Sequence, residues 1–384
     1  GINYEQLLNW VRPEGDAFKV IPGDFVTTEE GTGIVHTAPT FGADDYRVSA
    51  ANNISAVIVR DKAGLSQPLV DKQGRFFRID DLDPEFVDEF VNHNSYGNFA
   101  GKYVKNEYDK SKNEKDESTD VEIAVFLKQN NQAFKIEKYV HNYPHCWRTD
   151  KPVLYYPLDS WMIRTTSMKD RMIELNNTIN WKPEATGTGR FGKWLENLMD
   201  WNLSRSRFWG TPLPVWVSKD GAEKKCIGSV AELKDEIEKS VLAGYMKENP
   251  LADFIEGDNS KENYQKFDLH RPFVDNIVLV TDDGKEMYRE TDLIDVWFDS
   301  GAMPYAQMHY PFEHKDDFNQ YYPADFIAEG VDQTRGWFFT LHAIASMLFD
   351  SVAFKNIISN GLVLDKNGNK MSKRLKNAIN PYET

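Results

Sequence analysis

Three cations stand close together near the end of the chain: Lys370, Lys373 and Arg374, separated only by Met371 and Ser372. An apolar run and then a turn rich in Asn and Gly precede them, which predicts that the cations lie on a loop. Such a loop suits a polyphosphate, whose negative charge must be neutralised during group transfer. A solvated basic turn would have the same composition, so the cluster alone leaves both interpretations open.

A second candidate site combines acidic, amide and aromatic side chains: Glu329, Gly330, Asp332, Gln333 and Trp337. A carboxylate at a strand end can bind a substrate ammonium, and the acidic and amide residues of a following helical turn add acceptors and a donor. The tryptophan, one turn later, can form the wall of an apolar pocket. The alternative is purely structural, with Asp332 as a helix cap and Trp337 in the core.

Two further segments carry candidate residues. Trp297 lies in an aromatic and acidic cluster that ends in a turn, where it forms either a pocket wall or part of the core. In the first part of the chain, His36 follows a Gly-rich turn, and Asp44 and Asp45 come shortly after it. A histidine and a carboxylate near glycines can orient a water molecule or bind an amine. Alternatively, one of the two aspartates caps a helix that begins at Tyr46.

Other chemistries find little support. The sequence has no nucleophile-elbow motif, which argues against a Ser-His-Asp hydrolase. His145 and Cys146 supply at most half of a metal site, so we predict no metal there.

The two cysteines give no disulfide framework and favour a reducing, cytoplasmic setting. No apolar run approaches the length of a membrane span. The net charge of −15 argues against a general nucleic-acid coat but allows local basic grooves.

The elements that must position these residues are clearest in the last third of the chain. Residues 324–328 read as a strand, and 356–359 as another. Between them Trp337, Leu341, Ile344 and Leu348 repeat at helical spacing. This order predicts a βαβ unit of a parallel sheet, in which ligands bind beyond the carboxyl ends of the strands. Glu329 and the basic loop would both lie there.

The rest of the chain is organised less clearly. Short β-branched runs occur at 18–21 and 54–59, and Ser118 or Thr119 is placed to cap a helix over about 120–131. The apolar side of this helix is expected to contain Val121, Val125 and Leu127. A charged stretch at 106–120 reads as a solvated loop, and helices are predicted over 191–201 and near 229–241. The predicted divisions are a strand-rich α+β domain (1–140), a connective region rich in tryptophan (141–217), a polar insertion (218–290) and the second half of a Rossmann-type sheet (291–384).

Taken together, these segments resemble class I aminoacyl-tRNA synthetases, most specifically the isoleucine-specific family. The basic loop resembles the KMSKS signature, with Arg374 in place of the last serine, and residues 329–338 resemble the amino-acid site. Residues 295–301 and 204–212 also resemble segments of this family, and residues 31–45 resemble the signature of the editing insertion. The resemblance covers nearly the whole chain and is weakest over 60–135 and 218–290.

This resemblance implies roles for the matching residues. Glu329 would bind the ammonium of the isoleucyl-adenylate, with Gly330, Asp332 and Gln333 beside it, and Trp297 and Trp337 would form the walls of the side-chain pocket. The basic loop, Lys370 to Lys373, would hold the phosphates of ATP, which enters with Mg²⁺. Asp45 would bind the ammonium of a misactivated amino acid in the editing site, with His36 nearby. The implied partners are tRNA(Ile), isoleucine and ATP, and the implied parent is a cytoplasmic monomer.

The sequence departs from the family pattern in two respects. The His-x-Gly-His ATP signature and the Thr-rich editing strand are absent, and both would precede Gly1, so we expect a fragment that activates no amino acid by itself. Some bacterial relatives place a zinc-binding cysteine three residues after the one matching Cys146, where this chain has Thr149, so no zinc is expected. The rival hypotheses are a valine or leucine synthetase, a non-catalytic tRNA-binding paralogue and a stand-alone editing hydrolase.

Overall fold

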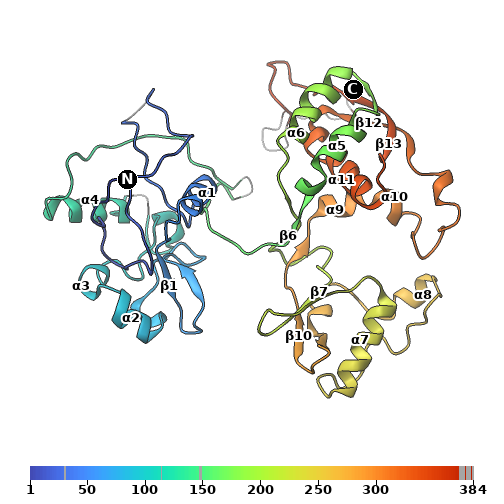
Figure 1. The fold of residues 1–384 in the computed structure, drawn as a ribbon, viewed down its shortest axis with the longest axis horizontal. Helices are drawn as coiled ribbons and strands as arrows, with labels where there is room; N and C mark the ends of the chain where they lie inside the picture. The colour runs from blue at the N-terminus through green and yellow to red at the C-terminus, as the bar shows by residue number, and fades with distance from the viewer. Residues whose placement is uncertain (30–31, 114, 147–148, 372–376, 378–381, 383–384) are drawn as a thin grey trace. The chain divides into compact units, whose positions relative to one another are not determined.

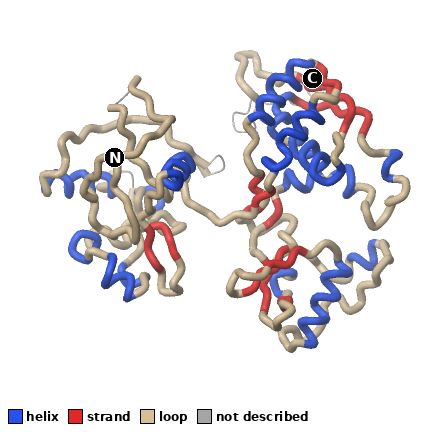
Figure 2. Tube along the Cα trace, in the orientation of Figure 1, coloured by secondary structure: helices blue, strands red, loops and turns tan. Residues whose placement is uncertain are grey.

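The computed structural model describes residues 1–29, 32–113, 115–146, 149–371, 377 and 382. The chain forms two compact units, Gly1–Asp159 and Ser160–Thr384. The first unit therefore extends beyond the predicted division at residue 140. Figures 1 and 2 show the course of the chain and its helices and strands.

The first unit is built from short elements around one apolar core. Trp10, Val59, Phe86, Tyr96 and Phe99 are among its buried residues. Its helices are α1 (Ala43–Ala51), α2 (Pro84–Phe90), α3 (His93–Tyr96) and α4 (Thr119–Gln129), with short 3₁₀ turns at Ile79–Asp81 and Asn106–Tyr108. Its strands β1 (Ile58–Arg60) and β2 (Ser66–Pro68) form an antiparallel hairpin.

Helix α4 confirms one prediction in this unit and corrects another. The Ser118 hydroxyl accepts a hydrogen bond from the backbone N–H of Val121, so Ser118 is the cap. The predicted apolar side was wrong, because Val121 and Val125 are exposed and Ile123 and Phe126 pack against the core instead. The run at 18–21 forms only an isolated bridge between Asn3 and Lys19 rather than a strand.

The second unit contains the predicted parallel sheet. Strand β12 (Ala324–Gly330), helix α11 (Trp337–Phe349) and strand β13 (Phe354–Asn360) form a βαβ unit, and β4 (Asn180–Lys182) adds a third parallel strand beside β13. The α/β fold with a parallel sheet is thus confirmed. Within α11 the residues Leu341 and Ile344 are buried as predicted, but Leu348 is exposed and does not belong to the core face.

Helices surround this sheet and contribute to its core. They are α5 (Lys169–Asn176), a π-helical turn (Thr186–Phe191) running into α6 (Gly192–Glu196), α9 (Val296–Gly301) and α10 (Met303–Ala306), with 3₁₀ turns at Thr165–Met168, Phe318–Gln320 and Val331–Arg335. The helix predicted over 191–201 therefore ends at Glu196. The unit also contains two short antiparallel strand pairs. Strand β3 (Met162–Ile163) pairs with β5 (Trp201–Asn202), and β6 (Ser204–Arg205) pairs with β11 (Leu293–Ile294).

Residues 215–289 form a subdomain with a core of its own. Its antiparallel sheet has the order β8-β7-β10-β9. The strands are β7 (Val215–Ser218), β8 (Lys224–Cys226), β9 (Val278–Val280) and β10 (Glu286–Arg289), and the helices are α7 (Val230–Leu242) and α8 (Lys261–Tyr264), with a 3₁₀ turn at Val274–Asn276. The predicted helix near 229–241 is confirmed as α7, whose cap is the Ser229 hydroxyl. Trp216 and Leu279 are among the residues buried between sheet and helix.

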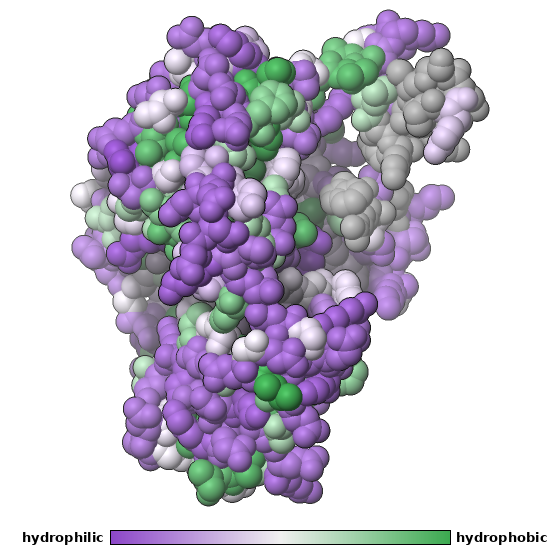
Figure 3. Space-filling model, turned by 90° about the vertical axis from the view of Figure 1, so that its right-hand side faces the viewer, coloured by the Kyte–Doolittle hydropathy of each residue, from purple (hydrophilic) through white to green (hydrophobic). Residues whose placement is uncertain are grey.

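On the face shown in Figure 3, most of the coloured side chains are hydrophilic, in a chain of which 27% of the residues are charged. On the face shown in Figure 3, apolar side chains appear as separate patches among polar ones. Among the described residues, no helix combines the length and the apolar character needed to cross a bilayer.

Candidate active site

The carboxyl ends of β12 and β13 lie side by side. Glu329 is paired with Ser359, and Gly330 with Asn360, in parallel register. Paired residues of neighbouring strands present their side chains on the same face of a sheet. Glu329 is half-buried, and the Ser359 hydroxyl is buried without a hydrogen-bond partner among the described groups. Glu329 therefore lies at the sheet edge where α/β proteins bind ligands.

The turn after β12 brings three of the predicted residues together. The side-chain oxygen Oε1 of Gln333 accepts a hydrogen bond from the backbone N–H of Trp337 at 3.0 Å. Asp332 is exposed and its carboxylate folds back on Gly330, since a Cβ atom added to that glycine would lie 2.6 Å from Oδ1. The alternative in which Asp332 caps the helix is thus wrong, because Gln333 satisfies the first N–H of α11.

The two predicted tryptophans lie near the same turn. The indole N–H of Trp337 donates to the carbonyl oxygen of Ser300 at 2.8 Å and so joins α11 to α9. A Cβ atom added to Gly336 would lie 2.8 Å from Gln333 Oε1 and 3.3 Å from Trp297 Cη2. Trp297 is 41% exposed and Trp337 is half-buried, so neither is an ordinary core residue. Their partial exposure leaves aromatic surface available to a ligand.

Buried polar contacts fix the helix that carries Trp297. Asp295 is buried and caps α9 by accepting a hydrogen bond from the backbone N–H of Trp297. Its Oδ2 atom also accepts hydrogen bonds from the Trp201 indole at 3.0 Å and from Arg205 at 2.7 Å. A buried carboxylate with this many donors is rigidly oriented. The Asp295 cap of α9 therefore fixes the position of Trp297.

Asp299, one turn along α9, is in a different environment. Loss of water around its carboxyl group, together with the nearby Asp295 carboxylate, raises the pKa of Asp299, although a hydrogen bond from the Thr211 hydroxyl at 3.1 Å acts in the opposite direction. Asp299 belongs to the segment that we singled out in the sequence, but only the structure links it to Thr211.

One further support of this region was missed by sequence reasoning. Arg190, in the π-helical turn, donates from Nε to the Thr334 hydroxyl at 2.8 Å, and that hydroxyl donates to the carbonyl oxygen of Val331 at 2.8 Å. The contact joins residues that are 144 positions apart, so no local pattern could have revealed it. It braces the turn that contains Asp332 and Gln333.

Asp365 organises the start of the basic loop. Its Oδ1 atom accepts hydrogen bonds from the backbone N–H groups of Asn367 and Asn369 at 2.9 and 2.8 Å. A hydrogen bond from the Asn377 side chain, followed by these backbone contacts, lowers the pKa of the Asp365 carboxyl. The resulting tight turn leads to Lys370, which is exposed, and Met371, which is half-buried. The predicted phosphate-binding residues Ser372 and Lys373, and also Arg374, lie outside the described residues.

The candidate editing residues lie in the first unit at the start of α1. Asp45 is in the first turn of this helix, and its Oδ2 atom accepts a hydrogen bond from the backbone N–H of Ala38 at 3.1 Å. The helix begins at Ala43 and its cap position is Gly42, so the alternative of an aspartate capping a helix at Tyr46 is wrong. His36 is exposed on the preceding loop, and within the described residues no hydrogen bond or ion pair joins it to Asp45.

Metal ligands do not gather in the part of the chain that the structure describes. Within those residues, no group of three or more His, Cys, Asp or Glu side chains is placed to hold an ion. Cys146, where half of a metal site was considered, is half-buried and lies beside residues outside the described ranges.

Comparison with known proteins gives a consistent result. The family model described as tRNA synthetases class I (I, L, M and V) matches residues 49–384. Proteins named isoleucine–tRNA ligase are 66% identical in Bacteroides fragilis and 64% identical in Porphyromonas gingivalis, each aligned with all of this chain and with 34% of its own length. The chain thus spans about a third of these relatives.

Among solved structures, methionyl-tRNA synthetase of Mycobacterium tuberculosis bound to methionyl-adenylate is 15% identical, with a TM-score of 0.36 over 64% of this chain and 34% of that one. This likeness is too low to add to the argument, which rests on the sequence family. Because the family model covers most of the chain, the chain belongs to the class I tRNA synthetases for isoleucine, leucine, methionine and valine.

Proposed function

We propose that the protein of which this chain is part attaches isoleucine to tRNA(Ile) in an ATP-dependent reaction. The observation that carries the proposal is the group at the entrance to α11, where Glu329 lies near the carboxyl end of β12, Gln333 and Trp297 approach Gly336, and Trp337 follows that glycine in the chain. A carboxylate beside partly exposed indole rings suits an amino acid with an apolar side chain. The relatives of 66% and 64% identity that are named isoleucine–tRNA ligase support isoleucine as that amino acid.

The proposed reaction has two steps. Isoleucine and ATP first form isoleucyl-adenylate and pyrophosphate, and the acyl group then passes to the terminal adenosine of the tRNA with release of AMP. Glu329 holds the α-ammonium, with Asp332 and Gln333 beside it. Lys370 and Lys373 hold the phosphates of ATP, which binds as its Mg²⁺ complex. No enzyme nucleophile is needed, because positioning and charge stabilisation lower the barrier.

The same proposal includes hydrolytic editing of valyl-tRNA by the first unit. A pocket for isoleucine cannot strongly reject valine, because one methylene is worth only about 1–3 kcal/mol, a limit for which isoleucine-specific synthetases are the standard example. Asp45 is the proposed ligand of the misactivated amino acid's ammonium. In support, Oδ2 of Asp45 accepts a hydrogen bond from the backbone N–H of Ala38, whereas Oδ1 accepts none from the residues that the structure describes. His36 is proposed to lie near the bound ester.

A valine- or leucine-specific activity is the principal alternative, since the family model spans all of these enzymes. The experiment that separates them is ATP–pyrophosphate exchange by the longer parent protein with each of the twenty amino acids. We expect strong exchange with isoleucine and weaker exchange with valine. Exchange led by valine or leucine would contradict the proposal, and no exchange at all would favour a tRNA-binding or editing role.

Two further assays address the finer points. The parent protein should deacylate valyl-tRNA(Ile) faster than isoleucyl-tRNA(Ile), and Asp45→Ala should abolish the difference. The 384-residue chain by itself should give no isoleucine-dependent exchange, because the ATP signature of the family is absent from its sequence. Exchange by this chain alone would disprove that part of the proposal.

A further inference from the structure

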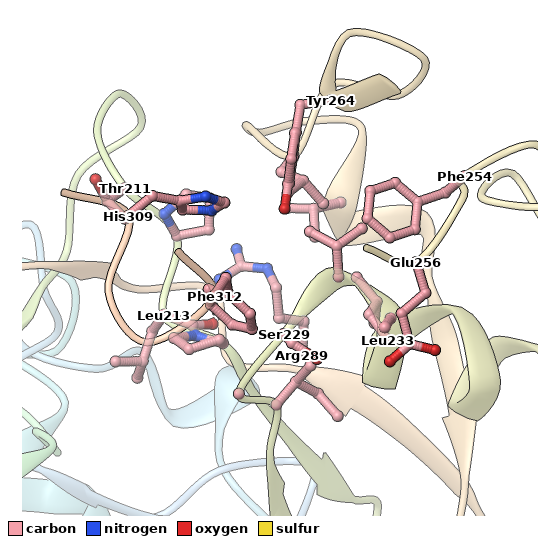
Figure 4. Close-up of a pocket in the computed structure, with 18 of the residues that line it drawn as sticks. Thr211, Leu213, Ser229, Leu233, Phe254, Glu256, Tyr264, Arg289, His309 and Phe312 are labelled. Atoms are coloured by element: carbon pink, nitrogen blue, oxygen red, sulfur yellow. Dashed lines mark hydrogen bonds between the residues drawn. The ribbon is translucent and has the colours of Figure 1, made fainter. Parts of the chain in front are cut away.

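A pocket of about 570 Å³ lies in the subdomain formed by residues 215–289 and the segments that border it (Figure 4). Its wall includes Thr211, the beginning of α7, the segment around Phe254, and a loop that contains His309 and Phe312. The volume falls within the usual range of small-molecule sites, about 300–1,000 Å³. None of the residues proposed for the adenylate site or the editing site lines it.

The floor of the pocket is apolar. Leu213, Ile227, Leu233, Phe254 and Val274 line it, and each of them is buried. Apolar walls of this kind stabilise the hydrocarbon part of a ligand by removing it from water. The floor therefore suits an apolar ligand body.

Aromatic rings follow one another along the wall. The ring centroids are 5.4 Å apart for Phe254 and Tyr264, 5.6 Å for Tyr264 and His309, and 5.3 Å for His309 and Phe312. In Figure 4 the hydroxyl end of Tyr264 points toward the interior of the pocket. Tyr264 and Phe312 are 37% and 53% exposed, so ring surface is accessible. The faces of such rings attract cations.

Arg289 is the cation in the lining, but it has no hydrogen-bonding capacity left for a ligand. Its side chain is 1% exposed and forms an ion pair with Asp275. Nε and Nη2 donate to Asp275, Nη1 donates to the carbonyl oxygens of Leu213 and Asp292, and Nη2 also reaches that of Thr291. These contacts account for all five N–H groups of a guanidinium. A carboxylate or phosphate ligand would find no free donor there.

Negative charge remains available in the lining and near it. Glu256 lines the pocket, is exposed, and has no ion pair or hydrogen bond among the contacts of the described residues. Glu313 contacts the lining residue His309, with 2.9 Å between Oε2 of Glu313 and Nδ1 of His309. Burial raises the pKa of Tyr264, and the nearby charges of Glu313 and Asp258 act in the same direction.

From the apolar floor, the accessible rings, the saturated arginine and the unpaired carboxylate, we propose that this pocket binds a small amphipathic amine. The apolar body lies against the floor. The ammonium group faces the rings and is attracted by the Glu256 carboxylate. The proposal does not depend on the ligase activity, because it involves a separate set of residues.

The test is the binding of phenethylamine to the 384-residue chain by titration calorimetry at low salt, with phenethyl alcohol as the uncharged analogue. The amine should bind about fivefold to tenfold more tightly than the alcohol, from the cation–ring and carboxylate contacts. Added salt should reduce this difference, because it screens charges that are exposed. Equal affinities, or no binding of the amine, would overturn the proposal.

Variants identify the site. Glu256→Gln should reduce the affinity for the amine to about that for the alcohol. Glu248 is an exposed carboxylate outside the lining, so Glu248→Gln should leave the affinity for the amine unchanged. Ala231→Leu, which adds volume within the lining, should weaken both ligands. An amine affinity that is unaffected by Glu256→Gln would contradict the proposal even if the Ala231 variant failed to fold. Loss of amine binding in the longer parent protein would also contradict the proposal, because it would mean that another part of that protein fills the pocket.

Discussion

Gln333 and Trp337 are joined by a hydrogen bond of 3.0 Å, in which the amide oxygen of Gln333 accepts from the first backbone N–H of α11. The same glutamine lies within the 3₁₀ turn Val331–Arg335 that follows Glu329, so a side chain of this turn satisfies the first N–H of the helix. The geometry links the stability of α11 to the arrangement of the proposed amino-acid site.

Removing this contact should destabilise the second unit. Gln333→Ala leaves the N–H of Trp337 without its partner, and loss of a helix cap costs about 0.5–2 kcal/mol. Gln333→Glu keeps an acceptor at the helix N-terminus and should retain most of the stability. Urea unfolding followed by tryptophan fluorescence would measure both variants. Equal stability of Gln333→Ala and the unaltered chain would show that the cap contributes nothing.

Two glycines of the π-helical turn offer a matched pair. A Cβ atom at Gly187 would lie 2.3 Å from Trp181 Cδ1, whereas one at Gly189 would meet no atom within 4 Å. Gly187→Ala should therefore destabilise the unit by about 1–3 kcal/mol through overpacking, and Gly189→Ala should be neutral or stabilise it by up to about 1 kcal/mol. Thermal unfolding of the two variants provides the comparison, and a similar loss in both would refute the steric explanation.

His342 should make stability depend on pH. Complete burial lowers its pKa from 6.5 to about 4, although a hydrogen bond to the Met172 carbonyl opposes the shift. Because the folded pKa is below the unfolded one, the unfolded chain binds the proton first. The contribution of neutral His342 is complete above about pH 6.5 and declines as the pH falls toward 4, by about 3 kcal/mol in total.

His342→Leu removes this titration. Its unfolding free energy should change less between pH 7 and pH 4.5 than that of the unaltered chain, even if its stability at pH 7 is lower because the contact with Met172 is lost. Denaturant titrations across this pH range would measure the difference. Parallel pH profiles for the two proteins would assign the acid sensitivity to other groups.

Glu329 provides a direct test of the proposed amino-acid site in the parent protein. Glu329→Gln removes the charge that would hold the ammonium, and loss of a charge-assisted hydrogen bond of about 1.5–3 kcal/mol corresponds to an increase in KM for isoleucine of roughly 10-fold to 150-fold. The control is Asp325→Asn on the same strand, an exposed carboxylate paired with Lys355 at 2.8 Å. An equal effect of the two substitutions on pyrophosphate exchange would contradict the role of Glu329.

The parts of the fold that depend on local pattern were predictable. The helical repeat containing Leu341 and Ile344 between two apolar runs was enough to predict the βαβ unit, because spacing determines which side chains share a face. Ser118 or Thr119 was predicted as a cap for the same local reason, and in the structure the cap is Ser118. The family motifs indicated Glu329, Gln333, Trp297 and Trp337, and two of these, Gln333 and Trp297, approach Gly336 in the structure.

Long-range contacts decided the rest. The contact between Arg190 and Thr334, the buried Asp295 with its donors from Trp201 and Arg205, and the exposure of Val121 and Leu348 depend on which elements pack together. Local sequence limits the choice of helix or strand, but the face that is buried and the partner of each polar group are set by tertiary packing. The sequence therefore indicated which residues to propose for the site, and only the folded chain determined how those residues are held.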